Sequence, residues 1–240
     1  MGLKPVGILG GMGPEATVLL MQKVIAAVRA DDDADHVPLI VDQNPQVPSR
    51  LKHLLEGNGE DPGPVLAAMA RRLEAAGARA LAIPCNTAHH FASSVREASA
   101  LPFLDMIALS TDRAAAMLPE GRRVGILASP AVRRVGLFQS ALAAKGLTAV
   151  YPTDEAAQVA AIRRIKASGA DDTARALLRQ ASADLLEQGA VVQMVACTEF
   201  SLIAGEVAPG VRSFDTLDGL VSAIVAFSGV PRERIQQFAV

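Results

Sequence analysis

Val6-Gly7-Ile8-Leu9, near the start of the chain, occurs again as Val124-Gly125-Ile126-Leu127. Each copy is a short apolar run that is followed by a loop and then by a longer segment with the spacing of an amphipathic helix. An apolar run without alternation is typical of a strand that is covered on both faces, as in a parallel sheet. The repetition therefore predicts that the chain is built from two similar α/β halves.

A second repeated pattern places one cysteine at the same point of each half. The pattern is Leu73-Glu74, Gly77-Ala78 and Cys85 in the first half, and Leu186-Glu187, Gly189-Ala190 and Cys197 in the second. We expect each glycine to end a helix, because many helices close on a residue with positive φ. Each cysteine then lies just past the carboxyl end of the next strand, which is where open α/β sheets bind their ligands.

The other apolar runs complete an alternation of strands and helices. The strand candidates are residues 6–9, 38–41, 79–84, 102–104, 124–128, 147–150, 191–196 and 212–214. The helix candidates lie near residues 15–30, 62–76, 87–98, 108–117, 132–145, 155–168, 171–188 and 217–228. This alternation predicts an α/β fold with two similar doubly wound parallel-sheet domains and an active site in the cleft between them. We expect an N-terminal domain of residues 1–110, to which residues 210–240 return, and a C-terminal domain of residues 111–209.

Composition excludes several classes of protein. Of the 240 residues, 50% are apolar and 20% are charged, so a large core can form and global disorder is excluded. A net charge of −2 and 3% aromatic residues argue against a nucleic-acid partner and a base-stacking surface. The apolar runs are too short for a membrane span or a secretion signal. We expect a cytoplasmic protein with two free thiols and a small substrate held by polar groups.

Cys85 and Cys197 are the candidate catalytic residues. Cys85 is expected to open a helix, and Cys197 opens a segment with weaker helical character. The free N–H groups at the start of a helix lower the pKa of a nearby thiol. If the two halves face each other, the thiols lie on opposite sides of one cleft, and two bases on opposite faces of one carbon atom suit stereoinversion. Asn86, Thr87 and Thr198 follow the cysteines and offer polar groups for a carboxylate and an ammonium. The alternative is that both cysteines are small buried apolar residues.

Two other chemistries have weaker support. The segment Gly11-Met12-Gly13-Pro14-Glu15-Ala16 matches the G-x-G-x-x-A pattern of dinucleotide-binding loops. Pro14 lacks a phosphate-facing N–H and Glu15 would repel a phosphate, so we favour a tight turn beside a small-molecule cleft. Cys85 and His89 have a zinc-like spacing, but no second ligand pair follows, so no metal is expected. His89 remains a candidate helper of Cys85.

Arg50 and Lys166 are the candidate binding cations. Arg50 ends the proline-punctuated loop Asn44-Pro45-Gln46-Val47-Pro48-Ser49-Arg50, and a rigid loop holds a guanidinium in position for a carboxylate. Lys166 lies beside the apolar stripe of an expected helix. The alternative is that both are solvated surface residues.

These motifs resemble the aspartate/glutamate racemase superfamily, and most closely its aspartate racemase branch. The matching stretches are Gly10-Gly11-Met12-Gly13-Pro14 with Ala16-Thr17, Asn44-Pro45-Gln46 through Pro48 to Arg50, Gly59-Glu60-Asp61-Pro62, Pro84-Cys85-Asn86-Thr87-Ala88-His89 and Cys197-Thr198-Glu199. The similarity covers nearly the whole chain.

The resemblance implies two domains related by a pseudo-twofold axis, often a homodimer, and racemisation without pyridoxal phosphate or metal. The two cysteines are then acid and base. The matching substrate-binding positions are Met12 in the cleft lining, Arg50 and Lys166 at the distal carboxylate, and Asn86, Thr87, Thr198 and Glu199 around the amino acid. Three positions depart from the branch: Ser49 stands where Asp is usual, Ser129-Pro130-Ala131-Val132 where a Thr-rich loop is usual, and Ala196 where Gly is usual.

The sequence thus predicts a cofactor-independent amino-acid racemase that acts on aspartate, glutamate or a related acidic amino acid by two-base proton transfer at Cα. Its expected partner is the small substrate, and neither nucleic acid nor membrane. Two alternatives stand beside this prediction: a two-thiol isomerase of another small carboxylic acid, and a non-catalytic small-molecule binding protein on the same fold. Whether His89 or Glu199 assists catalysis is left open by the sequence.

Overall fold

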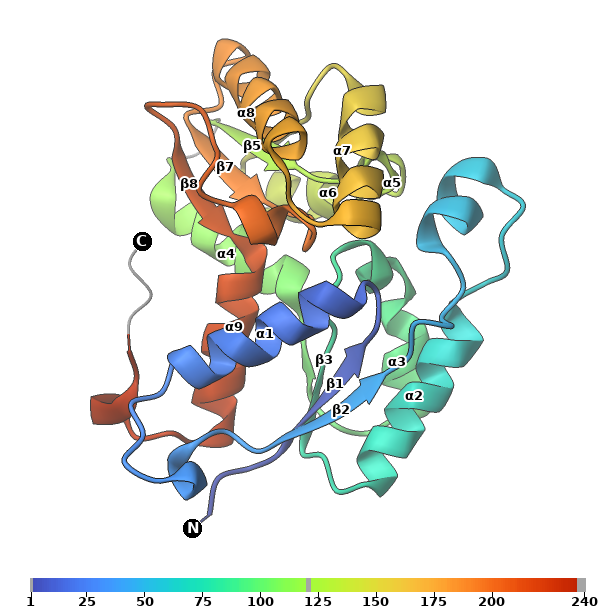
Figure 1. Cartoon of the computed structure of the whole chain (residues 1–240), viewed down its shortest axis with the longest axis vertical. Helices are drawn as coiled ribbons and strands as arrows, with labels where there is room; N and C mark the ends of the chain where they lie inside the picture. The colour runs from blue at the N-terminus through green and yellow to red at the C-terminus, as the bar shows by residue number, and fades with distance from the viewer. Residues whose placement is uncertain (1, 120–121, 237–240) are drawn as a thin grey trace.

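The computed structural model describes residues 2–119 and 122–236, which form two parallel β-sheets with helices around them (Figure 1). The strands are β1 (Val6–Gly10), β2 (Leu39–Gln43), β3 (Ala80–Ala82), β4 (Phe103–Leu104), β5 (Arg123–Leu127), β6 (Thr148–Val150), β7 (Val192–Val195) and β8 (Arg212–Asp215). The first sheet has the order β2-β1-β3-β4 and the second has β6-β5-β7-β8. The two orders are equivalent when β1 to β4 are matched with β5 to β8. The predicted fold class is confirmed.

Helices connect the strands and cover both faces of each sheet. The α-helices are α1 (Pro14–Ala26), α2 (Gly63–Ala75), α3 (Ala92–Ala98), α4 (Met106–Met117), α5 (Pro130–Arg134), α6 (Leu137–Ala143), α7 (Glu155–Ser168), α8 (Asp172–Glu187) and α9 (Thr216–Ser228). Short 3₁₀ turns are η1 (Asp33–Asp35), η3 (Thr87–Phe91), η4 (Phe200–Ile203) and η5 (Arg232–Arg234), and η2 (Lys52–Glu56) is a π-helical turn.

Four hydrophobic clusters form the core, one on each face of each sheet. Helices α1 and α9 cover one face of the first sheet, where Leu20 is fully buried, and α2 and α3 cover the other, where Leu66 is fully buried. Helices α4 and α6 cover one face of the second sheet around Phe138, and α7 and α8 cover the other around Leu178. Burial on both faces explains why most of the strands are mainly apolar, although β7 contains Gln193 and β8 has the sequence Arg-Ser-Phe-Asp.

The structure corrects the predicted helices at two places. The segment 87–98 is a 3₁₀ turn followed by α3, because Phe91, with φ −100° and ψ 16°, interrupts the helical geometry. The segment 132–145 is divided into α5 and α6 by Gly136, whose φ of 71° lies in the left-handed region. After Cys197 the chain forms only the 3₁₀ turn η4. Neither cysteine therefore stands at the start of an α-helix.

Helix α9 returns to the first half of the chain, although the strand before it does not. Strand β8 pairs with β7 in the second sheet. From there α9 runs back to pack on α1 and α4, and its Leu220 and Ile224 lie in the same core cluster as Leu20 of α1 (Figure 1). The proposed division into residues 1–110 with 210–240, and residues 111–209, stays a prediction.

Gly7 and Gly125 show why the repeated sequences fold in the same way. A Cβ atom on Gly7 would lie 2.9 Å from Cβ of Ala78, and one on Gly125 would lie 3.0 Å from Leu185 and 3.3 Å from Ala190. In the first half, the turn after α2 packs against β1, and in the second half the turn after α8 packs against β5. The N–H of Ala78 bonds the oxygen of Leu73, and the N–H of Ala190 bonds the oxygen of Leu185. Leu73 therefore corresponds to Leu185, whereas the repeated pattern in the sequence had paired it with Leu186.

We expect Gly7→Ala to lower the free energy of unfolding by about 1–3 kcal/mol, because the added methyl group overpacks a core with no space for it. Gly219→Ala is the matched control. Gly219 lies within α9, and its added Cβ would have no atom within 4 Å. There the change should stabilise the protein by about 0.5–1 kcal/mol, through helix propensity. Urea denaturation measures both, and equal stability of Gly7→Ala and wild type would contradict the packing argument.

Candidate active site

Both cysteines line one small cavity at the carboxyl ends of the two sheets. Cys85 follows β3 and Cys197 follows β7, and each is 7% exposed. We call this space of about 40 Å³ the inner cavity. Its lining consists of Met12, Ser49, Arg50, Leu51, Cys85, Thr87, Ser129, Ile162, Lys166, Cys197 and Glu199. The paired positions of the two cysteines in the repeat therefore lead to one shared site.

Seven of the nine predicted site residues line the inner cavity, and two do not. Asn86 and Thr198 are each 2% exposed and lie outside its lining. Ser49 and Ser129, which the sequence marked only as departures from the family pattern, do line it, together with Leu51 and Ile162. The sequence signal for Leu51 was its place directly after Arg50. The signal for Ile162 was the apolar stripe that leads to Lys166.

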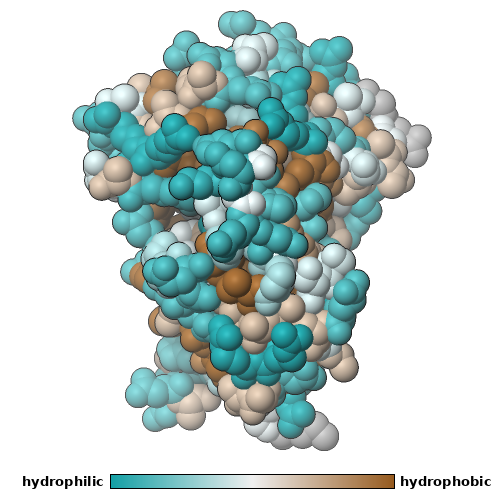
Figure 2. All heavy atoms as spheres, turned by 90° about the vertical axis from the view of Figure 1, so that its right-hand side faces the viewer, coloured by the Kyte–Doolittle hydropathy of each residue, from teal (hydrophilic) through white to brown (hydrophobic). Residues whose placement is uncertain are grey.

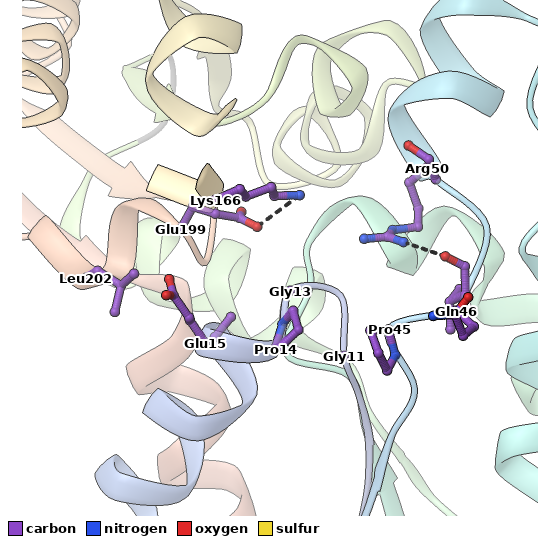
Figure 3. A pocket seen from close by; sticks show the side chains of 13 residues that line it. Gly11, Gly13, Pro14, Glu15, Pro45, Gln46, Arg50, Lys166, Glu199 and Leu202 are labelled. Carbon is purple, nitrogen blue, oxygen red and sulfur yellow. Dashed lines mark hydrogen bonds and ion pairs between the residues drawn. The ribbon is translucent and has the colours of Figure 1, made fainter. Parts of the chain in front are cut away.

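A larger space opens outside the inner cavity, and charged residues stand between the two. This outer cavity of about 670 Å³ runs along Gly11–Ala16 and the loop 45–50, and it shares Ser49, Arg50, Lys166 and Glu199 with the inner cavity. Figure 3 shows the guanidinium of Arg50 and the ammonium of Lys166 pointing toward one another across this opening. On the side of the molecule in Figure 2, hydrophilic residues cover most of both halves, and hydrophobic residues show between them.

Cys197 is part of a chain of three polar side chains. Its thiol donates a hydrogen bond to Oε2 of Glu199 at 3.0 Å, and Oε1 of Glu199 pairs with Nζ of Lys166 at 3.2 Å (Figure 3). Glu199 lies two residues after the cysteine, at the start of η4, whereas Lys166 comes from α7. The carboxylate therefore accepts the hydrogen bond of the thiol, while the ammonium balances the carboxylate charge.

The surroundings of Cys197 raise its pKa well above the ordinary value for a thiol. Burial is the largest cause, followed by the negative charge of Glu199 and the hydrogen bond to it, while Lys166 acts in the opposite direction. The expectation that a helix N-terminus lowers the pKa of this thiol is therefore wrong. The physical reasons are the burial of the sulfur and the Glu199 carboxylate beside it, and the segment after Cys197 forms a 3₁₀ turn. Cys197 thus rests as a neutral thiol.

Polar contacts from both halves surround Cys85. Oγ1 of Thr87 lies 3.2 Å from Oγ of Ser129, which follows β5 in the other half. On the opposite side, Nδ1 of His89 bonds the backbone oxygen of Cys85 at 2.9 Å. The structure places no side-chain carboxylate within hydrogen-bonding distance of the Cys85 sulfur among the described residues. The two thiols therefore have different electrostatic surroundings.

His89 is a structural residue in a fixed protonation state. Its Nε2 accepts a hydrogen bond from the backbone N–H of Met106 at 3.1 Å, so the proton must be on Nδ1, which donates to the oxygen of Cys85. Complete burial lowers the pKa of His89, and this keeps the ring neutral. Both ring nitrogens are occupied, which leaves none for proton exchange with a substrate. His89 instead ties the Cys85 segment to the first residue of α4.

The glycine-rich loop brings Met12 into the inner cavity by a close approach of two backbones. Gly11 has a φ of 91°, and a Cβ there would lie 2.4 Å from the backbone carbon of Asn44. Thr17, which is fully buried, accepts a hydrogen bond from the N–H of Gly11 at 2.9 Å. The glycines are thus explained by packing against the loop after β2. This supports the interpretation of the loop as one wall of a small-molecule cleft.

Asp215 caps α9 in an unfavourable environment for a charge. Its Oδ1 accepts bonds from the hydroxyl of Ser201 at 2.9 Å and the N–H of Leu217 at 2.8 Å, whereas Lys23 lies 4.0 Å from Oδ2. Burial, and then the neighbouring Asp218, raise the pKa of Asp215 from 3.8 to about 6. Above this pH the folded state holds a buried carboxylate, which costs stability.

We expect Asp215→Asn to raise the free energy of unfolding at pH 8, by up to about 3 kcal/mol, because the pKa difference between folded and unfolded states corresponds to that energy. Asparagine can still accept both bonds and is an equally good helix cap. As the pH falls through 6 toward 4, the wild-type carboxyl takes up its proton in the folded state, and the advantage of the variant should disappear. Urea unfolding across this pH range measures it, and a pH-independent difference would contradict the assignment.

Two parallel-sheet halves of the same topology, with one cysteine from each at a shared cavity, define a two-thiol α/β protein. The chain belongs to the Asp/Glu/hydantoin racemase family, whose family model matches residues 9–225.

Solved structures agree with this assignment. The aspartate racemase of Picrophilus torridus matches with a TM-score of 0.83 and 27% sequence identity, over 94% of this chain and 94% of that chain. An aspartate racemase homologue from Pyrococcus horikoshii has a TM-score of 0.71 and 24% identity, over 94% and 99% of the two chains. A glutamate racemase from Francisella tularensis has a TM-score of 0.66 and 14% identity, over 94% and 81%. The last two show the fold alone.

The described part of the chain lacks two other kinds of feature. Within residues 2–119 and 122–236, no group of three or more His, Cys, Asp or Glu side chains is arranged to hold a metal ion. In the same part of the chain, no helix has the length and apolarity needed to cross a membrane.

Proposed function

We propose that this protein is a cofactor-independent racemase of a small acidic amino acid, with aspartate the first candidate and glutamate the second. The observation that carries the proposal is that Cys85 and Cys197, from matching positions of the two halves, line the same inner cavity. A homodimer and a cytoplasmic location remain predictions from the sequence.

The proposed reaction is a proton transfer across the α-carbon. In one direction, the Cys85 thiolate removes the α-proton, so that the Cα–H bond breaks, an S–H bond forms, and the electron pair remains on the substrate as a carbanion. The Cys197 thiol then gives its proton to the opposite face of that carbon. The product has inverted configuration, with Cys85 a thiol and Cys197 a thiolate, and the reverse reaction starts from this state.

Glu199 and Lys166 support the starting state of this reaction. The hydrogen bond from Cys197 to Glu199 favours the thiol, and so assigns the first base to Cys85 for one enantiomer. When Cys197 gives up its proton, its negative charge develops beside the Glu199 carboxylate, and Lys166 offsets the repulsion. The rates in the two directions should therefore respond differently to changes at Glu199.

The positive charge at the opening of the inner cavity is the reason for proposing acidic amino acids as the first candidate substrates. Arg50 and Lys166 stand at the opening between the outer and inner cavities. Because Lys166 is paired with Glu199, the guanidinium of Arg50 is the cation assigned to a distal carboxylate. The inner cavity of about 40 Å³ is much smaller than the outer cavity of about 670 Å³. Substrate entry therefore requires side chains at the opening to move, and Lys166, whose side chain is 41% exposed, has the freedom to do so.

A second candidate function is supported by the residues that depart from the aspartate racemase pattern. Ser49 and Ser129 both line the inner cavity, where that branch usually has an aspartate and a threonine-rich loop. These smaller groups change the hydrogen bonds available to the substrate and leave the thiols in place. They favour a two-thiol isomerase of another small carboxylic acid.

Chiral chromatography of reactions with both enantiomers of the common amino acids tests the proposal. The enzyme should be dialysed against a chelator and assayed without pyridoxal phosphate. We expect aspartate or glutamate to approach a racemic mixture from either side. Dependence on added metal or pyridoxal phosphate would overturn the mechanism, and thermal stabilisation by a ligand without turnover would point to a binding protein.

A further inference from the structure

The hydroxyl of Thr216 bonds to both cysteine-bearing segments. Nδ2 of Asn86, the residue after Cys85, donates to Oγ1 of Thr216 at 3.0 Å. The same Oγ1 donates to the backbone oxygen of Val195, two residues before Cys197, at 3.0 Å. Thr216 is 1% exposed, so these bonds form away from solvent. A single side chain thus links the two thiol segments, which belong to different sheets.

The directions of these bonds are fixed by the single proton of the hydroxyl. Because Thr216 donates that proton to the carbonyl of Val195, it can only accept from Asn86. The amide of Asn86 is therefore oriented with Nδ2 toward Thr216. Its Oδ1 is buried and has no hydrogen-bond partner among the described residues. Without the hydroxyl, nothing in this arrangement sets the orientation of the amide beside Cys85.

The start of α9 also holds the far side of the Cys197 segment. Asp215, directly before Thr216, accepts a hydrogen bond from Ser201, which follows Cys197 in η4. Asp215 and Thr216 together therefore contact the chain before Cys197, the chain after Cys197 and the residue after Cys85. Since α9 packs on α1 and α4, this contact point is set on a rigid element of the core.

We propose that Thr216 is a positioning residue that fixes the placement of the two thiols relative to each other. The proposal rests on the proposed two-thiol function. Two bases act on one carbon atom only when both are held at the reacting distance, and a misplacement of about 1 Å can cost about a hundredfold in rate. Thr216 touches neither cysteine side chain and acts through Asn86 and Val195. No feature of the sequence marks Thr216 except its place directly after a strand.

The test compares Thr216→Val with Thr216→Ser and with a matched control. Valine has the shape of threonine without the hydroxyl, and serine keeps the hydroxyl. Thr111→Val is the control, since Thr111 is also 1% exposed and, among the described residues, its hydroxyl bonds only to the oxygen of Ala108 within α4. We expect Thr216→Val to lower kcat by about 10- to 100-fold with KM changed less than about threefold. Thr216→Ser should restore kcat to within about threefold, and Thr111→Val should match wild type.

A second measurement does not depend on catalysis. The rates at which iodoacetamide alkylates Cys85 and Cys197, followed by mass spectrometry, should rise at least about threefold in Thr216→Val, because looser segments expose the buried sulfurs. They should not change in Thr111→Val. If Thr216→Val does not fold, Thr216→Ala removes the hydroxyl with less bulk and serves in the same comparison.

The outcomes separate this proposal from the proposed function. An inactive wild type, with alkylation rates that still respond to Thr216, would overturn the racemase and keep the positioning role. An active wild type, with Thr216→Val as fast as Thr111→Val in kcat and in alkylation, would overturn the positioning role alone. A Thr216→Ser variant as slow as Thr216→Val would show that the hydroxyl is not responsible.

Discussion

Cys85→Ala and Cys197→Ala are each expected to reduce racemisation by at least about a thousandfold in both directions, because inversion requires one base and one acid on opposite faces of the carbon. A variant with a single thiol retains either the base or the acid, and lacks the other. The measurement is the rate of change of optical rotation, or chiral chromatography, from each enantiomer. Both cysteines lie in well-packed clusters, and loss of one sulfur atom should cost only about 1 kcal/mol of stability.

Exchange in heavy water makes this prediction sharper. A single remaining thiolate can remove the α-proton and return a deuteron to the same face, without inversion. We expect Cys197→Ala to exchange only one enantiomer, and Cys85→Ala only the other. At pH 7 the exchange by Cys85→Ala should be the slower of the two, since burial and Glu199 raise the pKa of the remaining Cys197 thiol.

Two results would contradict the two-base assignment. One is near wild-type racemisation by either single variant. The other is exchange of the same enantiomer by both variants, which would place both thiols on one face of the substrate. Circular dichroism and thermal unfolding of each variant serve as the control, because a loss of activity counts only when the fold is intact.

The parts of the fold that local sequence patterns determine were predictable. All eight strand candidates correspond to strands, because burial on both faces makes most of them short, mainly apolar runs. The repeat around Gly7 and Gly125 has one shared cause, since the turn after α2 packs on Gly7 and the turn after α8 packs on Gly125. The positions of Cys85 and Cys197 at one cavity followed from the repeat and from the rule on strand ends.

The parts that depend on contacts between distant segments were not predictable. Nothing in the sequence near Lys166 shows that its ammonium reaches Glu199, because α7 and η4 are brought together only by the second sheet. The role of Thr216 depends on α9, which leaves the second sheet and packs on the first half. The pKa of Cys197 was expected to fall and instead rises, because the sulfur is buried and the Glu199 carboxylate lies beside it.

Arg50 and Lys166 are expected to differ in what they contribute, although the sequence suggests the same role for both. Arg50→Ala should lower kcat/KM for acidic amino acids by about one to two orders of magnitude, since a charge-assisted bond contributes roughly 1.5–3 kcal/mol. Neutral amino acids should lose much less. Its Nη1 bonds only to the backbone oxygens of Val47 and Pro48 within the described structure, so the two thiols do not depend on it directly.

Lys166→Ala should instead slow acidic and neutral substrates together. Removing Lys166 leaves the Glu199 carboxylate without its cation and takes away an interaction that lowers the pKa of Cys197. The pH profile of kcat should then move to higher pH, a change not expected for Arg50→Ala. Arg50→Lys and Lys166→Arg, which keep the charges, are the matched controls. If Arg50→Ala slowed neutral and acidic substrates equally, Arg50 would not select a distal carboxylate. An unchanged pH profile in Lys166→Ala would mean that Lys166 does not act through Glu199 on the sulfur.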